Sequence, residues 1–348
     1  VDPLELIDEF GADAVRFTLS SMASMGRDLK LSTARVTGYR NFSTKLWNAV
    51  RFAGMYDVEF VLNSGADLPQ NVNMTINRWI IGETARVRED VDAALAAYRF
   101  DDASSALYKF VWNVVCDWYV EFSKPVLQGE ASDEKAETQA VMGWVLNNCM
   151  TLLHPFMPFV TEELWRVTGH DGMLVHGTWP ENVTSEVIDT ASETEIHWVI
   201  AFIEAVRSAR AQMNVPAGAY VPVVAVDWDD TARKPYETNA VMISALARIE
   251  GLTEGAAPRG SIAVTAMGSR FALPLEGIID VAAERARLDK SLAKLENEIK
   301  GIEGRVNNPK FAGSAPPEVV EETRANLAER QSERDAVQTA LNSLAELG

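Results

Sequence analysis

Apolar residues recur at helical spacing through the first half of the chain. These stripes predict a long helix ending near Tyr56, helices over residues 75–99, 101–124 and 134–153, and a fifth helix after two prolines at 155 and 158. The stripe of the long helix consists of Phe42, Leu46, Ala49, Val50 and Ala53. That of the 101–124 helix, which Pro125 is expected to end, consists of Leu107, Phe110, Val111, Val114 and Trp118. Amphipathic helices with short connections predict an α-helical bundle.

Two short helices are predicted ahead of this bundle. Asp2 and Pro3 are residue types preferred at the N-cap and the first helical position, and Gly11 is a typical helix end. A second helix is expected over residues 12–23, and a short extended connector over 27–32.

The pattern changes after residue 195. A helix over 196–213, strands over 221–226, near Ile249, over 262–266 and over 271–275, and a helix over 236–245 predict a small α+β unit. Gly268 and Ser269 are expected to form the turn of its last hairpin.

The last 68 residues carry a heptad pattern. Its first run, spaced 4, 3, 4, 3 and 4, is Leu288, Leu292, Leu295, Ile299, Ile302 and Val306. A second run, after a break at residues 307–309, is Val320, Thr323, Leu327, Arg330, Arg334, Val337, Leu341 and Leu344. So short a connection predicts an antiparallel coiled-coil hairpin with arms roughly 40 to 45 Å long.

The fold class is therefore predicted as mainly α, with a helical bundle, a small α+β domain and a C-terminal antiparallel coiled-coil hairpin. The expected divisions are residues 1–32, the bundle over 33–170, a connector over 171–195, the α+β domain over 196–280 and the hairpin arm over 281–348. A chain of 348 residues with 47% hydrophobic content can build two or three cores of this kind.

Composition argues for a cytoplasmic protein without a metal site. No apolar run reaches the roughly 18 residues of a membrane span, and no signal peptide is recognisable. Cys116 and Cys149 lack metal-site spacing and are expected to be buried, reduced thiols; the four histidines have no zinc spacing either. The chain begins with Val1 rather than Met, so we expect a fragment of a longer protein.

The charge distribution indicates a polyanionic partner. The whole chain has a net charge of −18, yet residues 16–56 contain seven basic residues and the single acid Asp28. Within this stretch Asn41, Lys45, Asn48 and Phe52 fall on one helix face. Amides, a cation and an aromatic ring can bind base edges, phosphates and unpaired bases. The alternative is an ordinary solvated face with the aromatic residues in the core.

Four segments carry a family resemblance: RNFSTKLWNAVRF (40–52), DWYVEFSK (117–124), LHPFMPFVTEELW (153–165) and NNPKFAGSAPPEVVEE (307–322). They resemble the class I aminoacyl-tRNA synthetases for branched aliphatic amino acids, and among these the bacterial valyl-tRNA synthetases. The aromatic residues Trp118, Phe156 and Phe159 of these motifs are expected in the core. Residues 2–19 resemble the stem-contact segment that follows the family's lysine-serine loop.

The resemblance implies a tRNA-binding fragment without catalytic residues. The lysine-serine loop, which contacts ATP, and the glycine-histidine signature are both absent from this chain. We therefore expect no cofactor here, and a parent protein that uses ATP and magnesium to attach valine to tRNA.

The same resemblance implies site residues. Phe52 would stack on the middle anticodon base, Lys45 would contact the anticodon, and Val120 would help close the pocket. The basic residue that the family often has at the start of this helix falls on Ala34, so Arg35 is its nearest substitute.

The hairpin would pack on the tRNA elbow. Arg330 and Arg334 of its seam, with Lys310 of its tip, are the candidate phosphate contacts. The two arginines could instead extend their charged ends into solvent. Arg207 and Arg210 of the 196–213 helix could touch RNA, but an ordinary amphipathic helix explains them as well.

Two other functions compete with this interpretation. A helical scaffold would dimerise through its coiled coil, whereas an intrachain hairpin predicts a monomer. A hydrolase built on Asp117, Glu121 and His154 would lack a nucleophile and a glycine-rich elbow.

Overall fold

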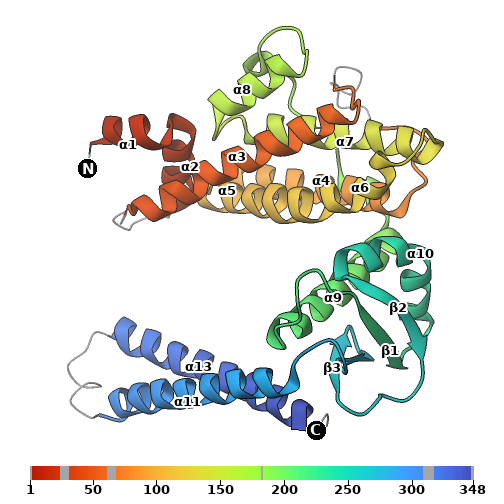
Figure 1. The fold of residues 1–348 in the computed structure, drawn as a ribbon. Coiled ribbons are helices and arrows are strands. Elements are labelled where there is room, and N and C mark those ends of the chain that lie inside the picture. The colour runs from red at the N-terminus through yellow and green to blue at the C-terminus, as the bar shows by residue number, and fades with distance from the viewer. Residues whose placement is uncertain (1, 24–30, 61–67, 182, 309–316, 346–348) are drawn as a thin grey trace. The chain divides into compact units, whose positions relative to one another are not determined.

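The computed structural model describes residues 2–23, 31–60, 68–181, 183–308 and 317–345, and divides into two compact units, Val1–His197 and Trp198–Gly348. Among these residues no helix has the length and apolar character needed to cross a membrane. Helices dominate both units, and the second also contains a four-stranded sheet (Figure 1).

The first unit is a helical bundle, as predicted. Its helices are α1 (Pro3–Phe10), α2 (Ala12–Met22), α3 (Thr33–Met55), α4 (Thr75–Ala96), α5 (Phe100–Tyr108), the π-helix η2 (Lys109–Tyr119), α6 (Val120–Gln128), α7 (Asp133–Leu153) and α8 (Pro158–Val167). Two 3₁₀ turns, η3 (Leu174–His176) and η4 (Ser185–Val187), precede α9 (Thr190–Gln212), whose residues from Trp198 onward belong to the second unit.

The apolar stripe of α3 forms part of the bundle core. All five predicted residues are buried, and Phe42 is fully enclosed, with its ring 5.3 Å from that of Phe17 in α2 and 5.0 Å from that of Tyr108 in α5. Burial of this stripe leaves the opposite side of α3 at the surface. The predicted periodicity of α3 is therefore confirmed.

The predicted register of the 101–124 helix is wrong beyond Val111. The buried residues there are Val115, Cys116, Tyr119 and Val120, whereas Val114 and Trp118 are only partly covered. The cause is η2, because hydrogen bonds from residue i to i+5 displace the apolar stripe from its α-helical positions. Pro125 also lies inside α6 rather than ending it.

The second unit contains the predicted α+β domain. Strands β1 (Val221–Asp227), β2 (Ile249–Glu254), β3 (Ser261–Ala266) and β4 (Ser269–Pro274) form a sheet in the order β2-β1-β4-β3, with only the β1–β2 pair parallel. Helix α10 (Asp230–Ala247) connects β1 to β2. The last hairpin turns at Met267 and Gly268, one residue earlier than predicted, because Ser269 already pairs with Ala266.

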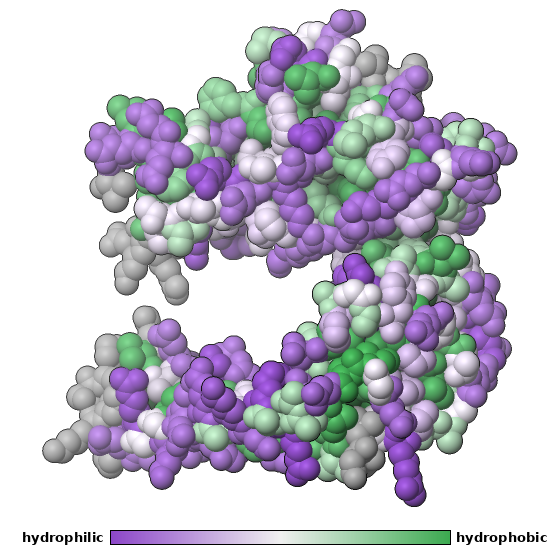
Figure 2. All heavy atoms as spheres, viewed as in Figure 1, coloured by the Kyte–Doolittle hydropathy of each residue, from purple (hydrophilic) through white to green (hydrophobic). Residues whose placement is uncertain are grey.

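The coiled-coil arm of the second unit consists of α11 (Val281–Val306) and α13 (Pro317–Ala345), which run side by side (Figure 1). The predicted seam is confirmed: its described residues on both helices are buried or half-buried, while most of their neighbours are exposed. At 1.5 Å per residue the helices are about 39 and 43 Å long. The face of the arm visible in Figure 2 is mostly hydrophilic, as expected for a hairpin with one narrow apolar seam.

A carboxylate from a distant helix completes the start of α4. The N-cap residue Met74 has no capping side chain. Instead, Glu137 of α7 accepts hydrogen bonds from the backbone N–H groups of Asn73 and Met74, at 2.9 and 2.8 Å, and from the side-chain amide of Asn77 at 2.9 Å. Asn77 in turn accepts a hydrogen bond from the Tyr119 hydroxyl, at 2.9 Å. One acidic side chain thereby links α7, α4 and the end of η2.

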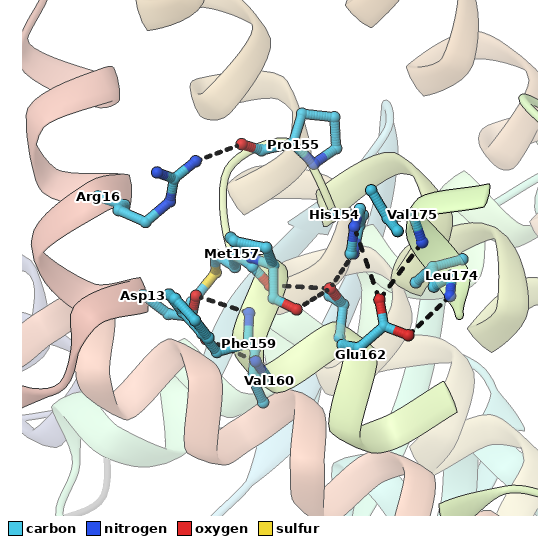
Figure 3. Close-up of polar contacts among 12 residues, drawn as sticks. Asp13, Arg16, His154, Pro155, Met157, Phe159, Val160, Glu162, Leu174 and Val175 are labelled. Carbon is cyan, nitrogen blue, oxygen red and sulfur yellow. Dashed lines mark hydrogen bonds and ion pairs between the residues drawn. The ribbon is translucent and has the colours of Figure 1, made fainter. Parts of the chain in front are cut away.

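The LHPFMPFVTEELW segment is held in the same way (Figure 3). Asp13 of α2 accepts hydrogen bonds from the backbone N–H groups of Phe159 and Val160, at 3.1 and 2.6 Å, and so caps α8. Arg16 of α2 donates to the carbonyl oxygens of Pro155 and Phe156. Phe156 is buried as predicted, but Phe159 is 63% exposed and is not a core residue, since its position on the first turn of α8 points its ring to solvent.

His154 lies next to this cap (Figure 3). Its Nδ1 is 2.9 Å from the Thr161 hydroxyl and its Nε2 is 3.9 Å from Glu162, whose carboxylate accepts hydrogen bonds from the N–H groups of Leu174 and Val175. Burial lowers the pKa of His154 below its usual 6.5, although the carboxylates of Glu162 and Asp13 act in the opposite direction. Burial raises the pKa of Asp13, against the effect of its two backbone hydrogen bonds.

We predict that Glu137→Ala destabilises the first unit by about 1 to 3 kcal/mol, because three donors would lose their acceptor in a partly buried place. Urea denaturation of the variant and the parent measures this difference. Glu130→Ala is the control, since Glu130 is an exposed acid of the same unit. Equal midpoints for Glu137→Ala and Glu130→Ala would contradict the prediction.

We also predict that acidification weakens the first unit through His154. A histidine whose folded pKa lies below 6.5 binds its proton more readily when unfolded, so its contribution to stability is present above pH 6.5 and is lost as the pH falls toward the folded pKa. Urea denaturation at pH 7.5 and 5.5 should therefore show a smaller loss of stability in His154→Asn than in the parent. An identical loss in both proteins would show that His154 does not carry this dependence.

Candidate functional site

The candidate nucleic-acid face lies on the side of α3 that the core leaves free. Helix α3 contains four cations and no acid, although it belongs to a chain of net charge −18. Arg35, Asn41 and Asn48 are exposed on it, while Lys45 and Phe52 are half-buried. The structure thus brings the predicted amides, lysine and aromatic residue to one accessible surface, bordered by residues of η2 and α6.

Lys45 is not a free cation. Its ammonium forms an ion pair with Asp117 of η2 and lies 3.9 Å from the centre of the Trp112 ring. The side chains of Lys45 and Asp117 are 25% and 46% exposed, so both can reach a ligand in solvent. The three side chains form a compact group of a cation, an anion and an aromatic face.

A second group of the same kind surrounds Phe52. Lys124 of α6 pairs with Glu121 at 2.5 Å, and its Nζ lies 5.8 Å from the centre of the Phe52 ring. The Phe52 ring also contacts Tyr56, with centroids 4.9 Å apart. Each aromatic ring of the face is therefore accompanied by a lysine whose charge a nearby carboxylate compensates.

Val120 is only 7% exposed. It belongs to the displaced apolar stripe of η2 and α6, so its side chain is buried rather than open on the face. Its predicted part in closing a base pocket remains a prediction.

Sequence reasoning missed three members of this face. Trp112 and Lys124 are not among the predicted site residues, and Asp117 is named only in the hydrolase alternative. Residues five apart diverge on an α-helix, so nothing in the local pattern placed Trp112 beside Asp117. The π-helix does so, because its i to i+5 hydrogen bonds bring residues five apart nearly one above the other.

Both cysteines are buried, as predicted. Burial raises the pKa of the Cys116 thiol to about 12, despite the nearby ammonium of Lys45, and also raises the pKa of Cys149. Neither thiol is therefore a ready nucleophile at neutral pH.

One group of potential metal ligands occurs among the described residues. Glu83, Glu193 and His197 place their ligating atoms within 4.8 Å of one another. Arg86 already pairs with Glu193 at 2.6 Å, and His197 lies 3.7 Å from Glu83. A metal ion would have to displace the guanidinium, so we assign these residues to an ion-pair network that joins α4 to α9.

The three residues of the hydrolase alternative, two carboxylates and one imidazole, belong to separate polar networks. Asp117 pairs with Lys45, Glu121 with Lys124, and His154 with Thr161 and Glu162. The Thr161 hydroxyl is fully buried and donates to the Met157 carbonyl, so it is not an accessible nucleophile, and the arrangement offers no support for hydrolysis.

The predicted arm residues are partly exposed. Arg330 pairs with Glu333 at 2.6 Å and Arg334 with Asp335 at 2.6 Å, and their side chains are 34% and 38% exposed. Arg330 lines an open groove of about 990 Å³ between α11 and α13, together with Lys294 and Arg305. Lys310 lies outside the described residues.

The two arginines predicted on the α9 helix donate to backbone carbonyl groups. Arg207 donates to the Leu246 carbonyl, and Arg210, which is buried, donates to the Arg248 carbonyl.

Comparisons with known proteins find two family matches in this chain. Residues 77–225 match a family described as the anticodon-binding domain of tRNA ligase, and residues 280–345 match the valyl tRNA synthetase tRNA binding arm. The first match includes η2 and α6, and the second includes both helices of the arm.

Similar full-length proteins carry one name. The chain is 57% identical to a valine–tRNA ligase of Cereibacter sphaeroides, 55% to that of Ruegeria pomeroyi and 45% to that of Rhizobium meliloti, in each case over its whole length. It spans only 35%, 34% and 37% of these three relatives. With these two family matches and this identity throughout, the chain belongs to the valine–tRNA ligase family and spans about a third of the length of these relatives.

Proposed function

We propose that this chain is the tRNA-binding part of a valine–tRNA ligase. The face of α3, η2 and α6 would read the unpaired anticodon, and the coiled-coil arm would brace the tRNA elbow. Aminoacylation with valine, using ATP and magnesium, would take place in a part of the protein that this chain does not include. The contribution of the chain is thus to position the tRNA.

The observation that supports anticodon binding best is the composition of the α3 face. Aromatic rings, exposed amides and cations are the groups that stack on unpaired bases, bind their edges and attract the backbone. Phe52 is half-buried, which holds its ring in a defined orientation while leaving part of it accessible. Lys124 lies over that ring and would have to move aside, or the base would use the other side of the ring.

The arm offers a different kind of contact. Its cations alternate with acids, and the described pairs of Arg330 and Arg334 are surface pairs. Such pairs contribute little stability, so a phosphate can replace the carboxylate at small cost. The arm would therefore bind the backbone without reading sequence.

We expect the protein to work in the cytoplasm, as a monomer, because the coiled-coil seam is covered within one chain. Its partner would be the tRNA specific for valine.

We predict that Phe52→Ala weakens tRNA binding about 5- to 150-fold and reduces discrimination between anticodon variants, since stacking of one base contributes about 1 to 3 kcal/mol. Fluorescence anisotropy with cognate and anticodon-swapped tRNA measures both effects. Phe159→Ala is the matched control, because it removes an exposed aromatic ring outside the α3 face. If Phe52→Ala binds and discriminates like the parent, Phe52 is not the stacking residue.

We predict that replacing Arg330 and Arg334 by leucine stabilises the arm but weakens tRNA binding. Leucine at a seam position buries more apolar surface, whereas loss of two phosphate contacts should reduce the dependence of log Kd on log[salt] by about 2. Thermal unfolding and a salt titration of tRNA affinity measure the two changes.

Arg270→Leu is the control for this pair, because Arg270 is exposed on the sheet of the same unit. A double variant whose affinity and salt dependence both equal those of the parent would remove these arginines from the interface.

A further inference from the structure

The ion pair of Lys45 makes the α3 face locally neutral at the point where the resemblance expects a contact with the anticodon. Unlike the more exposed arginines of the arm, Lys45 is only 25% exposed, and its ammonium lies against both Asp117 and the Trp112 ring, so a phosphate does not readily replace the carboxylate. A phosphate brought to Lys45 would meet the carboxylate as well. The group therefore suits a neutral ligand better than an anion.

The shape of the group suits a nucleobase. The Trp112 ring provides an aromatic surface, and its centre is 3.9 Å from the Lys45 ammonium. Lysine offers only hydrogen-bond donors and an ionised aspartate only acceptors, so the pair presents one donor and one acceptor side by side. The edge of an unpaired base carries the complementary arrangement.

The two polar groups are not equally accessible. Asp117 is 46% exposed, whereas Lys45, which lies over the indole ring, is 25% exposed. An incoming base edge therefore meets the carboxylate first. In adenine and cytosine the exocyclic amine lies beside a ring nitrogen that accepts, whereas guanine and uracil have a carbonyl oxygen and a ring N–H at these positions. A carboxylate that receives the amine, next to an ammonium that donates to the ring nitrogen, therefore fits adenine and cytosine and is opposed by the carbonyl oxygen of the other two bases at the same place.

We propose that Asp117 determines specificity by accepting a hydrogen bond from the exocyclic amine of an unpaired adenine or cytosine, while Lys45 donates to the adjacent ring nitrogen. This inference rests on the proposed anticodon-binding function and adds a base-reading residue to it. The π-helix is what makes the arrangement possible, because it brings Trp112 and Asp117 together toward α3.

The pair also has a second effect. Asp117 keeps Lys45 from attracting phosphates of any sequence, so non-cognate RNA gains nothing from this lysine. Removal of the carboxylate should therefore strengthen non-specific binding while it weakens discrimination. These opposite changes separate a base-reading role from a merely structural one.

The test is Asp117→Asn in the whole chain, measured against tRNA in which adenine is replaced by inosine, or cytosine by uracil, at one anticodon position at a time. Each replacement exchanges the amine for a carbonyl oxygen and the acceptor ring nitrogen beside it for an N–H donor, so both proposed contacts are lost. At the position that Asp117 reads, the parent should bind the carbonyl form about 5- to 150-fold more weakly. In the variant this preference should fall severalfold, because an asparagine amide can donate to the carbonyl.

A salt titration completes the experiment. With Lys45 released, the dependence of log Kd on log[salt] for non-cognate RNA should increase by about 1 in Asp117→Asn. Glu163→Gln is the matched control: Glu163 is also 46% exposed and pairs with Arg166 at 2.6 Å, but on α8. It should change neither quantity. Circular dichroism confirms that both variants remain folded.

The outcomes distinguish this inference from the proposed function. If the parent discriminates between anticodon variants but Asp117→Asn discriminates equally well, or if the parent prefers the carbonyl forms, Asp117 does not read an amine and only this inference is overturned. If the parent does not bind tRNA with any dependence on the anticodon, the proposed function itself fails.

Discussion

Two carboxylates that bind backbone N–H groups of distant helices hold the first unit in register. Asp13 caps α8 from α2, and Glu137 binds the residues that enter α4 from α7. The N-cap residues of α4 and α8 are both methionines without a capping hydrogen bond, so these helices depend on partners far away in the chain. The Glu137 network continues through Asn77 to Tyr119, and so fixes the end of the π-helix on which the candidate face depends.

The acidity of the chain has a structural explanation in part. Many of its acids have specific partners: backbone N–H groups for Asp13 and Glu162, and lysines of the candidate face for Asp117 and Glu121. Helix α3 itself carries no acid. A strongly negative protein can therefore present a surface on which cations, amides and aromatic rings are available to RNA, because its carboxylates are placed to shape that surface rather than to cover it.

Local compensation of charge also gives specificity. A lysine held by a carboxylate contributes little to the non-specific attraction that any polyanion feels, and the same carboxylate accepts hydrogen bonds that a phosphate cannot donate. The two lysines of the face, Lys45 and Lys124, both have this arrangement above an aromatic ring. The arm is different, since α11 and α13 contain paired cations but no aromatic residue, and it is suited to contacts with the backbone.

The sequence by itself determined the bundle, the α+β unit, the seam of the arm and the amide, lysine and aromatic residue of the α3 face, because each depends on periodicity within one segment. Only the tertiary structure decided the register of η2, the exposure of Phe159, the distant caps and the pairing of Lys45 with Asp117 and Trp112. These features depend on groups tens of residues apart, and a π-helix changes which residues share a face without any change in local composition. Lys45 was thus identifiable as a candidate contact, but its compensated charge was not.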